Sequence, residues 1–381
     1  MPAPRPLAII VFVLLLTGTQ PVAAADVAVW VYDFPRWSES QREAMSASLP
    51  PGTRHLYVSL EDGPAFLLRD DFRSADIQRL VGALRERPGI LTHAVILQDT
   101  RWLEDAEGAQ ARLARVVALN RAYPDRAFAG VHVDVQPQTL EDWECGGIPE
   151  RRALVQKLQV LFRRLASAIL MPGKDGSGRL QLSAALPWWI GSPAADIPEA
   201  SPRRFFESLD EIVLTAYGEP GGPRIGGSAQ MLLSRLEDAR LWQDIPSGKG
   251  LRIGLGTYEY AGAADLLATA SDLDRALGSQ KAYRGTAIFH SNGSYGAPLT
   301  ASVRGLVRDA EGRPVAHASV KVGGRQIATS RCGRFVARDL PVGAVTLEVK
   351  TFGLSSVTVQ VAGLEAGQEL EVPPIVLDRN P

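Results

Sequence analysis

Short apolar runs alternate with amphipathic segments along most of the chain. Between the runs, apolar residues recur at helical spacing, as in Leu154, Leu158, Leu161 and Leu165. Strands that alternate with helices form a parallel sheet. Eight units starting 28 to 50 residues apart predict a closed (β/α)8 TIM barrel, since an open doubly wound sheet would also need a glycine-rich first turn. The eight apolar runs are 27–33, 55–60, 93–98, 130–136, 180–187, 211–217, 251–257 and 285–291.

The pattern changes after the eighth run. A stretch rich in glycine and proline, 292–300, stands where the eighth helix of a barrel would be, so we expect that helix to be absent. From residue 301 the chain shows short alternating strands with turn sequences at 310–314 and 322–324, and no helical period. We therefore predict a barrel domain at 26–298 and a small all-β sandwich at 299–381.

The N-terminus has the pattern of a secretory signal. Arg5 is followed by an apolar segment, 7–16, and by small residues at 23–25, which predicts a signal peptide over 1–25. About ten apolar residues are too few to span a bilayer, and no later stretch is longer, so we expect no stable membrane span after cleavage. The expected location is secreted or periplasmic, with an uncleaved anchor as the alternative.

Composition restricts the class of binding partner, but it does not decide whether the two cysteines form a disulfide. The 381 residues are 45% hydrophobic and 22% charged, which excludes collagen-like, coiled-coil and wholly disordered proteins. The 41 basic and 42 acidic residues nearly cancel, and no basic stripe occurs, so we expect no nucleic-acid partner. The two cysteines, Cys145 and Cys332, could pair in an oxidising compartment or stay free, because the sequence does not set their distance.

The tail carries turn residues at regular positions, where hairpins require fixed or positive φ. The tail resembles the carboxypeptidase regulatory-like family of transthyretin-type β-sandwiches. That resemblance implies a spacer or a docking surface for a partner such as an envelope protein, and no catalytic residues. It rests on 303–305, Asp309, Gly312, Pro314, Val315, 318–320, 333–335 and 340–343.

The fourth run, 128–137, carries polar residues at alternate positions. Val131, Val133 and Val135 share one face of a strand. The other face presents His132, Asp134 and Gln136. If the valines face the helices, these polar side chains point into the barrel at its C-terminal end, where reactive groups of such barrels lie.

This polar face resembles the fourth-strand signature of chitinase-type glycoside hydrolases, Asp-Gly-hydrophobic-Asp-hydrophobic-Asp-x-Glu. The positions that match are Gly130, Val131, Val133 and Asp134, whereas Ala129 and His132 replace the first two aspartates and Gln136 replaces the glutamate that donates the proton. The sixth run adds Thr215, Ala216 and Tyr217, similar to the family's Met-x-Tyr-Asp, with Gly218 at the aspartate position.

The resemblance implies that Asp134 orients an acetamido group of a sugar and that Tyr217 hydrogen-bonds it. An amide cannot protonate a leaving oxygen near neutral pH, so Gln136 disables the family's own mechanism. The barrel would bind a glycan without cutting it, or use another acid. We single out Glu219, which follows the sixth-run motif. Other carboxylates after predicted strands are Asp33, Glu61, Asp99 and Glu259, each more often a solvated charge or a helix cap.

Aromatic residues follow several of the predicted strands. Tryptophan rings stack on sugar faces, so these residues favour a saccharide cleft, although each is about as compatible with packing of a loop. They are Trp37, Trp102, Trp143, Trp188 and Trp189. A metal site of His132 and Asp134 with His290 and Asp33 is the less favoured alternative, because no further ligand pattern supports it.

We therefore predict an exported glycoside hydrolase-like barrel that binds a polysaccharide and could hydrolyse it. The alternatives are a lectin-like protein or an envelope scaffold that docks through its tail. No metal or cofactor is expected. The predicted catalytic residues are Asp134 and Glu219, and the predicted substrate-binding residues are His132, Gln136, Tyr217, Trp188, Trp143 and His290.

Overall fold

The structure is a computed structural model of the whole chain. It describes residues 26–32, 49–62, 65–68, 89–169, 180–188, 197–218, 227–238, 241–289, 301–365 and 368–379. The predicted signal segment 1–25 therefore lies outside the described residues.

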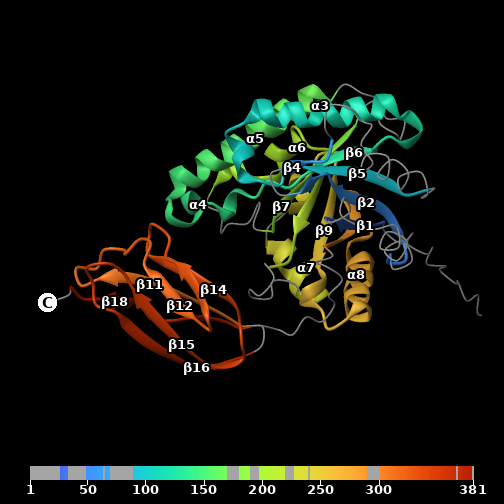
Figure 1. The fold of residues 1–381 in the computed structure, drawn as a ribbon. Coiled ribbons are helices and arrows are strands. Elements are labelled where there is room, and N and C mark those ends of the chain that lie inside the picture. The colour runs from blue at the N-terminus through green and yellow to red at the C-terminus, as the bar shows by residue number, and fades with distance from the viewer. Residues whose placement is uncertain are drawn as a thin grey trace, which may run out of the picture.

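Eight parallel strands close into a barrel in the order β1-β10-β9-β8-β7-β6-β5-β2. Figure 1 shows this barrel with the C-terminal domain beside it. This confirms the predicted (β/α)8 fold, with each strand at the expected place in the sequence. The strands are β1 Val27–Val31, β2 Thr53–Ser59, β5 Leu91–Ile96, β6 Gly130–Val133, β7 Gln181–Pro187, β8 Glu211–Thr215, β9 Gly250–Gly256 and β10 Tyr283–Phe289. A two-stranded hairpin of β3 Glu61–Asp62 and β4 Ala65–Phe66 follows β2.

Helices cover the outside of the barrel. The apolar stripe predicted from Leu154 to Leu165 is the buried face of the longest described helix, α5. The stretch 292–300, where we expect no eighth helix, lies outside the described residues. The helices are α3 Ala106–Ala122, α4 Glu141–Cys145, α5 Ile148–Ala168, α6 Pro202–Phe206, α7 Ala229–Asp238 and α8 Ala263–Leu277. Single 3-10 turns are η2 Thr100–Leu103, η3 Pro124–Arg126, η4 Pro137–Thr139, η6 Pro198–Ala200, η7 Leu241–Asp244 and η8 Thr257–Glu259.

The barrel has two cores, because side chains of a strand alternate between its faces. The outer core, between strands and helices, is mainly aliphatic and includes Val131 and Val133. The interior contains aromatic and polar residues, among them Trp30 and Tyr57. Near the N-terminal ends of the strands, Tyr57 and Arg252 both bond to Glu211, at 2.8 and 3.0 Å. This buried ion pair fills the lower part of the barrel.

The C-terminal domain is a β-sandwich, as predicted from the turn spacing. One sheet has the order β14-β11-β17, with β18 also paired to β11, and the other has the order β13-β12-β15-β16. Alternating residues such as Val320, Phe335 and Leu347 form the core between the sheets. The strands are β11 Ala301–Asp309, β12 Ser319–Val322, β13 Arg325–Ala328, β14 Arg334–Leu340, β15 Gly343–Lys350, β16 Val357–Leu364, β17 Glu369–Glu371 and β18 Ile375–Leu377.

Among the described residues, no helix combines the length and the apolar character that a membrane crossing requires.

Candidate functional site

The polar face of the fourth barrel strand points inward, as the alternation predicted. Val131 and Val133 of β6 pack in the outer core. His132 lies between them and contacts interior residues, with its ring 4.3 Å from that of Tyr57 and 5.6 Å from that of Trp30. Asp134 and Gln136 follow β6 at the C-terminal end of the barrel, where we now describe the site.

His132 forms part of the barrel floor beneath the site. Its side chain is fully buried, and Nδ1 is 2.9 Å from the Ser183 hydroxyl. Burial lowers the pKa of His132 to about 3, so the ring is neutral at ordinary pH. Because Trp30 and Tyr57 enclose the ring, this placement does not support the predicted contact of His132 with a ligand.

Asp134 accepts hydrogen bonds on both of its carboxylate oxygens. The Tyr32 hydroxyl donates to Oδ2 at 2.8 Å, and the Gln136 amide nitrogen donates to Oδ1 at 2.8 Å. Burial raises the pKa of Asp134, while the bonds from Gln136 and Tyr32 act in the opposite direction. The carboxylate is only partly enclosed, so it can still present an oxygen to a ligand.

Gln136 is a link in a hydrogen-bond chain. Besides its bond to Asp134, its amide oxygen accepts a bond from the Gln138 amide at 3.0 Å. The chain thus runs from Tyr32 through Asp134 and Gln136 to Gln138 in η4. Gln136 therefore orients Asp134 and, as an amide, offers no proton for bond cleavage.

Tyr217 lies beside Asp134 in a group of aromatic rings. Its ring stacks on Phe289 at 5.3 Å and meets Tyr258 edge-on at 6.2 Å. Tyr32 also contacts Phe289, at 5.3 Å. Burial raises the pKa of Tyr217, and the nearby Asp134 carboxylate raises it further, so the phenol keeps its proton. Of these rings, Tyr32 bonds directly to Asp134 and Tyr217 lies close enough for the Asp134 charge to act on it.

Sequence reasoning overlooked Tyr32, Tyr258 and Phe289 as members of this site. Strand alternation could have identified Tyr32 and Phe289, because each lies at the C-terminal end of a barrel strand. Two positions before Tyr32 is the interior residue Trp30, and two positions before Phe289 is the interior residue Ala287, so both side chains share the interior face. No strand pattern could have identified Tyr258, since it lies in the turn η8 after β9.

Glycines of β9 leave room for these tyrosines. A Cβ atom at Gly256 would lie 2.9 Å from the Tyr258 ring and 3.1 Å from Cβ of Tyr217. Gly218 is fixed as well, since its N–H donates to Glu259 at 2.8 Å and its carbonyl accepts a bond from the Tyr258 hydroxyl. These contacts position Tyr217 at the end of β8.

The structure gives other roles to three of the alternative acids. Glu61 is buried, accepts the backbone N–H groups of Leu97 and Gln98, and pairs with Arg112. Asp99 caps η2, and Glu259 binds Gly218. The predicted catalytic Glu219, the predicted ligand contact His290, and Asp33 lie outside the described residues.

The described tryptophans occupy three different environments. Trp188 packs with the outer core, and Arg235 of α7 lies 5.0 Å from its ring, so this placement does not support contact with a ligand at the mouth. Trp102 is buried beneath Arg101 and Arg112. Trp143 in α4 is partly exposed and lines a cavity between the two domains. Trp37 and Trp189 lie outside the described residues.

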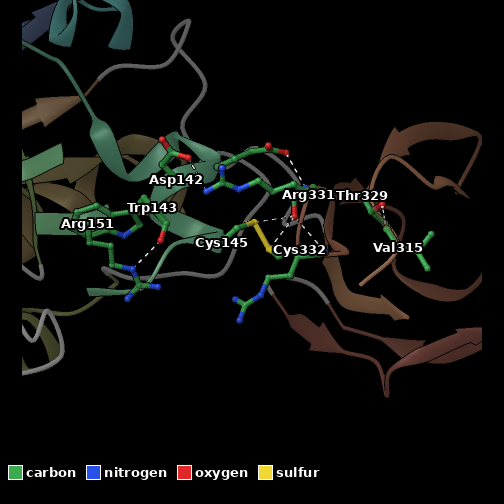
Figure 2. Close-up of a disulfide and its surroundings, with 11 residues drawn as sticks. Asp142, Trp143, Cys145, Arg151, Val315, Thr329, Arg331 and Cys332 are labelled. Carbon is green, nitrogen blue, oxygen red and sulfur yellow. Dashed lines mark hydrogen bonds and ion pairs between the residues drawn. A yellow bond between two sulfur atoms is a disulfide. The ribbon is translucent and has the colours of Figure 1, made fainter. Parts of the chain in front are cut away.

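A disulfide joins the two domains beside Trp143. Cys145 at the end of α4 is bonded to Cys332 in the turn before β14, with Cα atoms 5.4 Å apart (Figure 2). Arg331 forms an ion pair with Asp142 at 2.7 Å, and its backbone N–H donates to Glu141 at 3.3 Å. The question of cysteine pairing that the sequence left open is thereby answered.

Two members of the alternative metal site at the mouth, His290 and Asp33, lie outside the described residues. Within the described ranges, the one cluster of metal-ligating residue types is Glu144 with Cys145 and Cys332. Both sulfur atoms of that cluster are in the disulfide.

Comparisons with known proteins bear on the two domains separately. A search of curated protein sequences found no match. Among solved structures, the glycoside hydrolase domain of PgaB from Bordetella bronchiseptica is 10% identical, with 70% of this chain and 94% of that chain covered and a TM-score of 0.43. The spore cortex-lytic enzyme SleL from Bacillus megaterium QM B1551 is 16% identical. The match covers 61% of this chain and 51% of that enzyme, with a TM-score of 0.39.

The tail has matches of its own. A 3-chlorocatechol 1,2-dioxygenase from Rhodococcus opacus 1CP is 15% identical over 22% of this chain, with a TM-score of 0.19, and this chain spans 61% of that enzyme. Residues 302–378 match the family model of the carboxypeptidase regulatory-like domain. In sequence, residues 302–378 are therefore similar to the carboxypeptidase regulatory-like domain, and they form a β-sandwich joined to a (β/α)8 barrel.

Proposed function

We propose that this protein is exported and binds a polysaccharide of acetamido sugars at the mouth of its barrel. The observation that carries the proposal is the placement of Asp134 between Tyr32 and Tyr217. A carboxylate accepts a hydrogen bond from an amide N–H, and a protonated phenol donates one to an amide carbonyl. The rings of Tyr217 and Phe289 add an apolar surface against which a sugar face can stack.

The interdomain disulfide supports export. Disulfides persist in oxidising compartments and are rare in the cytosol. Cys145 and Cys332 are 187 residues apart, so the bond links the two domains of the folded chain. Together with the signal-like segment at 1–25, the disulfide favours a secreted or periplasmic location.

Replacing Asp134 with Asn tests the binding role. The variant keeps the side-chain shape but removes the charge, and a hydrogen bond to a charged group contributes about 1.5–3 kcal/mol. We expect the affinity for the hexasaccharide of N-acetylglucosamine, measured by calorimetry, to fall roughly 10- to 100-fold. Asp272→Asn, on the exposed face of α8, is the matched control.

Two results would argue against the proposal. One is a lack of binding by the unaltered chain, and the other is equal affinity of the Asp134→Asn and Asp272→Asn variants.

The pH dependence of glycan binding gives a further check. Because the pKa of Asp134 is raised, its carboxylate takes up a proton at a higher pH than an ordinary aspartate. Binding should therefore weaken as the pH falls through this raised value.

Cleavage of the glycan is a separate prediction. It would require a proton donor other than Gln136, and Glu219 is the residue that we assign to that role. If the chain releases shorter sugars from the hexasaccharide, Glu219→Gln should reduce the rate, while Asp272→Asn should not. A rate that Glu219→Gln leaves unchanged would reject the assignment.

A further inference from the structure

A cavity of about 780 Å³ lies between the barrel and the sandwich. This volume falls within the range of about 300–1,000 Å³ that is typical of small-molecule sites. On the barrel side, η4, α4 and the start of α5 form the wall, including Gln138 and Trp143. On the sandwich side, the wall includes His317, Arg334 and Arg338. We refer to this cavity as the interdomain cleft.

The interdomain cleft begins where the hydrogen-bond chain from the barrel mouth ends. Gln138 lines the cleft and donates to Gln136, which in turn donates to Asp134. The Gln138 amide oxygen is buried and has no hydrogen-bond partner among the described residues. A buried acceptor without a partner is costly. Because this oxygen is shielded from the cleft, a hydroxyl group there would satisfy it only after the Gln138 side chain turns toward the cleft.

The two walls are held together by covalent and ionic contacts. The Cys145–Cys332 disulfide and the Arg331–Asp142 ion pair connect α4 to the turn before β14 (Figure 2). Arg151 lies against Trp143, with its Nε donating to the Trp143 carbonyl at 2.8 Å and its guanidinium 5.8 Å from the ring. The wall that carries the aromatic ring is thus fixed before any ligand arrives, which reduces the entropy cost of binding.

We infer that the interdomain cleft is a second saccharide subsite, continuous with the barrel mouth and completed by the sandwich. The inference rests on the proposed function and extends it, because it assigns the tail to ligand binding. A chain of acetamido sugars anchored at Asp134 passes Gln138 and enters the cleft. There its hydroxyl groups meet the Arg334 guanidinium, and a sugar face meets Trp143.

The test compares ligands of two lengths on the full chain. The disaccharide of N-acetylglucosamine fills the mouth alone, whereas the hexasaccharide reaches the cleft. By calorimetry, we expect the unaltered chain to bind the hexasaccharide more tightly. Trp143→Ala and Arg334→Ala should each weaken hexasaccharide binding by roughly tenfold while changing disaccharide binding less than about twofold. Lys321→Ala is the control, since Lys321 is exposed on β12 outside the cleft.

Three outcomes of this comparison would overturn the inference, and one of them would also overturn the proposed function. If Arg334→Ala binds the hexasaccharide as tightly as Lys321→Ala, the sandwich takes no part and the inference is overturned. Equal affinity of the unaltered chain for both lengths also overturns it, but leaves the site at Asp134 intact. Absence of binding for either sugar overturns the inference together with the proposed function.

A double variant, Cys145→Ser with Cys332→Ser, tests whether the disulfide fixes the two walls of the interdomain cleft relative to each other. With the disulfide removed, the preference for the hexasaccharide should diminish while the disaccharide binds as before. Circular dichroism provides the control that both domains stay folded. A preference that persists in the folded double variant would overturn the role of the disulfide in shaping the subsite.

Discussion

At the scale of single residues, the neighbours of a carboxylate decide its chemistry. Glu61 and Asp134 both follow barrel strands, but Glu61 is surrounded by donors from its own chain. It accepts backbone bonds at 2.8 and 3.0 Å from Leu97 and Gln98, and Arg112 pairs with it. Leu97 has a positive φ of 61°, so these bonds also hold a strained turn. Glu61 is therefore a structural anchor of the loop after β5.

Replacing Glu61 with Ala should destabilise the barrel. Removal of one member of a buried ion pair costs about 3–5 kcal/mol, because the other charge is left without compensation. All seven tryptophans precede residue 301, so their fluorescence during urea unfolding reports on the barrel. Asp272→Ala removes an exposed pair with Arg275 and should cost less than about 1 kcal/mol. Similar losses in the two variants would contradict the anchoring role.

At the scale of elements, close backbone contacts determine where barrel strands begin. Gly285 near the start of β10 has a φ of 101°. A Cβ atom there would lie 2.1 Å from the Asp26 carbonyl oxygen, at the point where β10 meets β1. This glycine therefore permits the contact that closes the barrel between its first and last strands.

Gly285→Ala should weaken the closure of the barrel. The suitable control is Gly248→Ala, because Gly248 also has a positive φ, 83°, but no atom lies within 4 Å of its added Cβ. Both variants carry the backbone strain, whereas only Gly285→Ala is crowded. We expect Gly285→Ala to reduce the free energy of unfolding by about 1–3 kcal/mol more than Gly248→Ala. Equal losses would show that β1 and β10 can shift to accept the methyl group.

At the scale of the whole molecule, the barrel interior encloses histidines that stay neutral. Burial lowers the pKa of His132 to about 3 and that of His55 to about 4, with the Arg252 charge adding to the effect on His55. Burial also lowers the pKa of His93, and the nearby His55 and Arg252 side chains lower it further. The unfolded chain, with an ordinary histidine pKa of about 6.5, takes up these protons first.

The free energy of unfolding should therefore fall as the pH drops below about 6.5, and the loss should end near the lowered pKa values. Each buried histidine contributes up to about 1.4 kcal/mol per pH unit in that window. The raised pKa of Asp134 acts in the opposite direction, because the folded protein then binds a proton more readily. Urea unfolding at several pH values measures the net slope.

Variants separate the histidine effect from general acid sensitivity. His132→Phe removes one neutral imidazole from the interior and should reduce the slope below pH 6.5. His317→Asn, at an exposed sandwich position with a positive φ of 56° that asparagine tolerates, should leave it unchanged. A stability that is flat between pH 7 and pH 4.5 in the unaltered chain would contradict the argument.

Local sequence patterns were sufficient to predict the fold and the inward-facing polar residues of the fourth barrel strand. The alternation in 130–136 predicted that valines face the helices and that polar residues face the interior, because the geometry of a strand leaves no other arrangement. The turn residues likewise predicted the sandwich. Tyr258 and Gln138 could not be found in this way, since they lie in turns whose direction depends on packing across several strands.

The sequence by itself determined the closed barrel, the change to a sandwich near residue 300 and the inward direction of Asp134, because each follows from periodicity within a few neighbouring residues. Only the tertiary structure decided which residues meet across the chain. The burial of His132 under Trp30, the anchoring of Glu61 by Arg112 and the pairing of Cys145 with Cys332 depend on contacts between distant segments. Such contacts leave no local pattern, since their distances are set by how strands and domains pack.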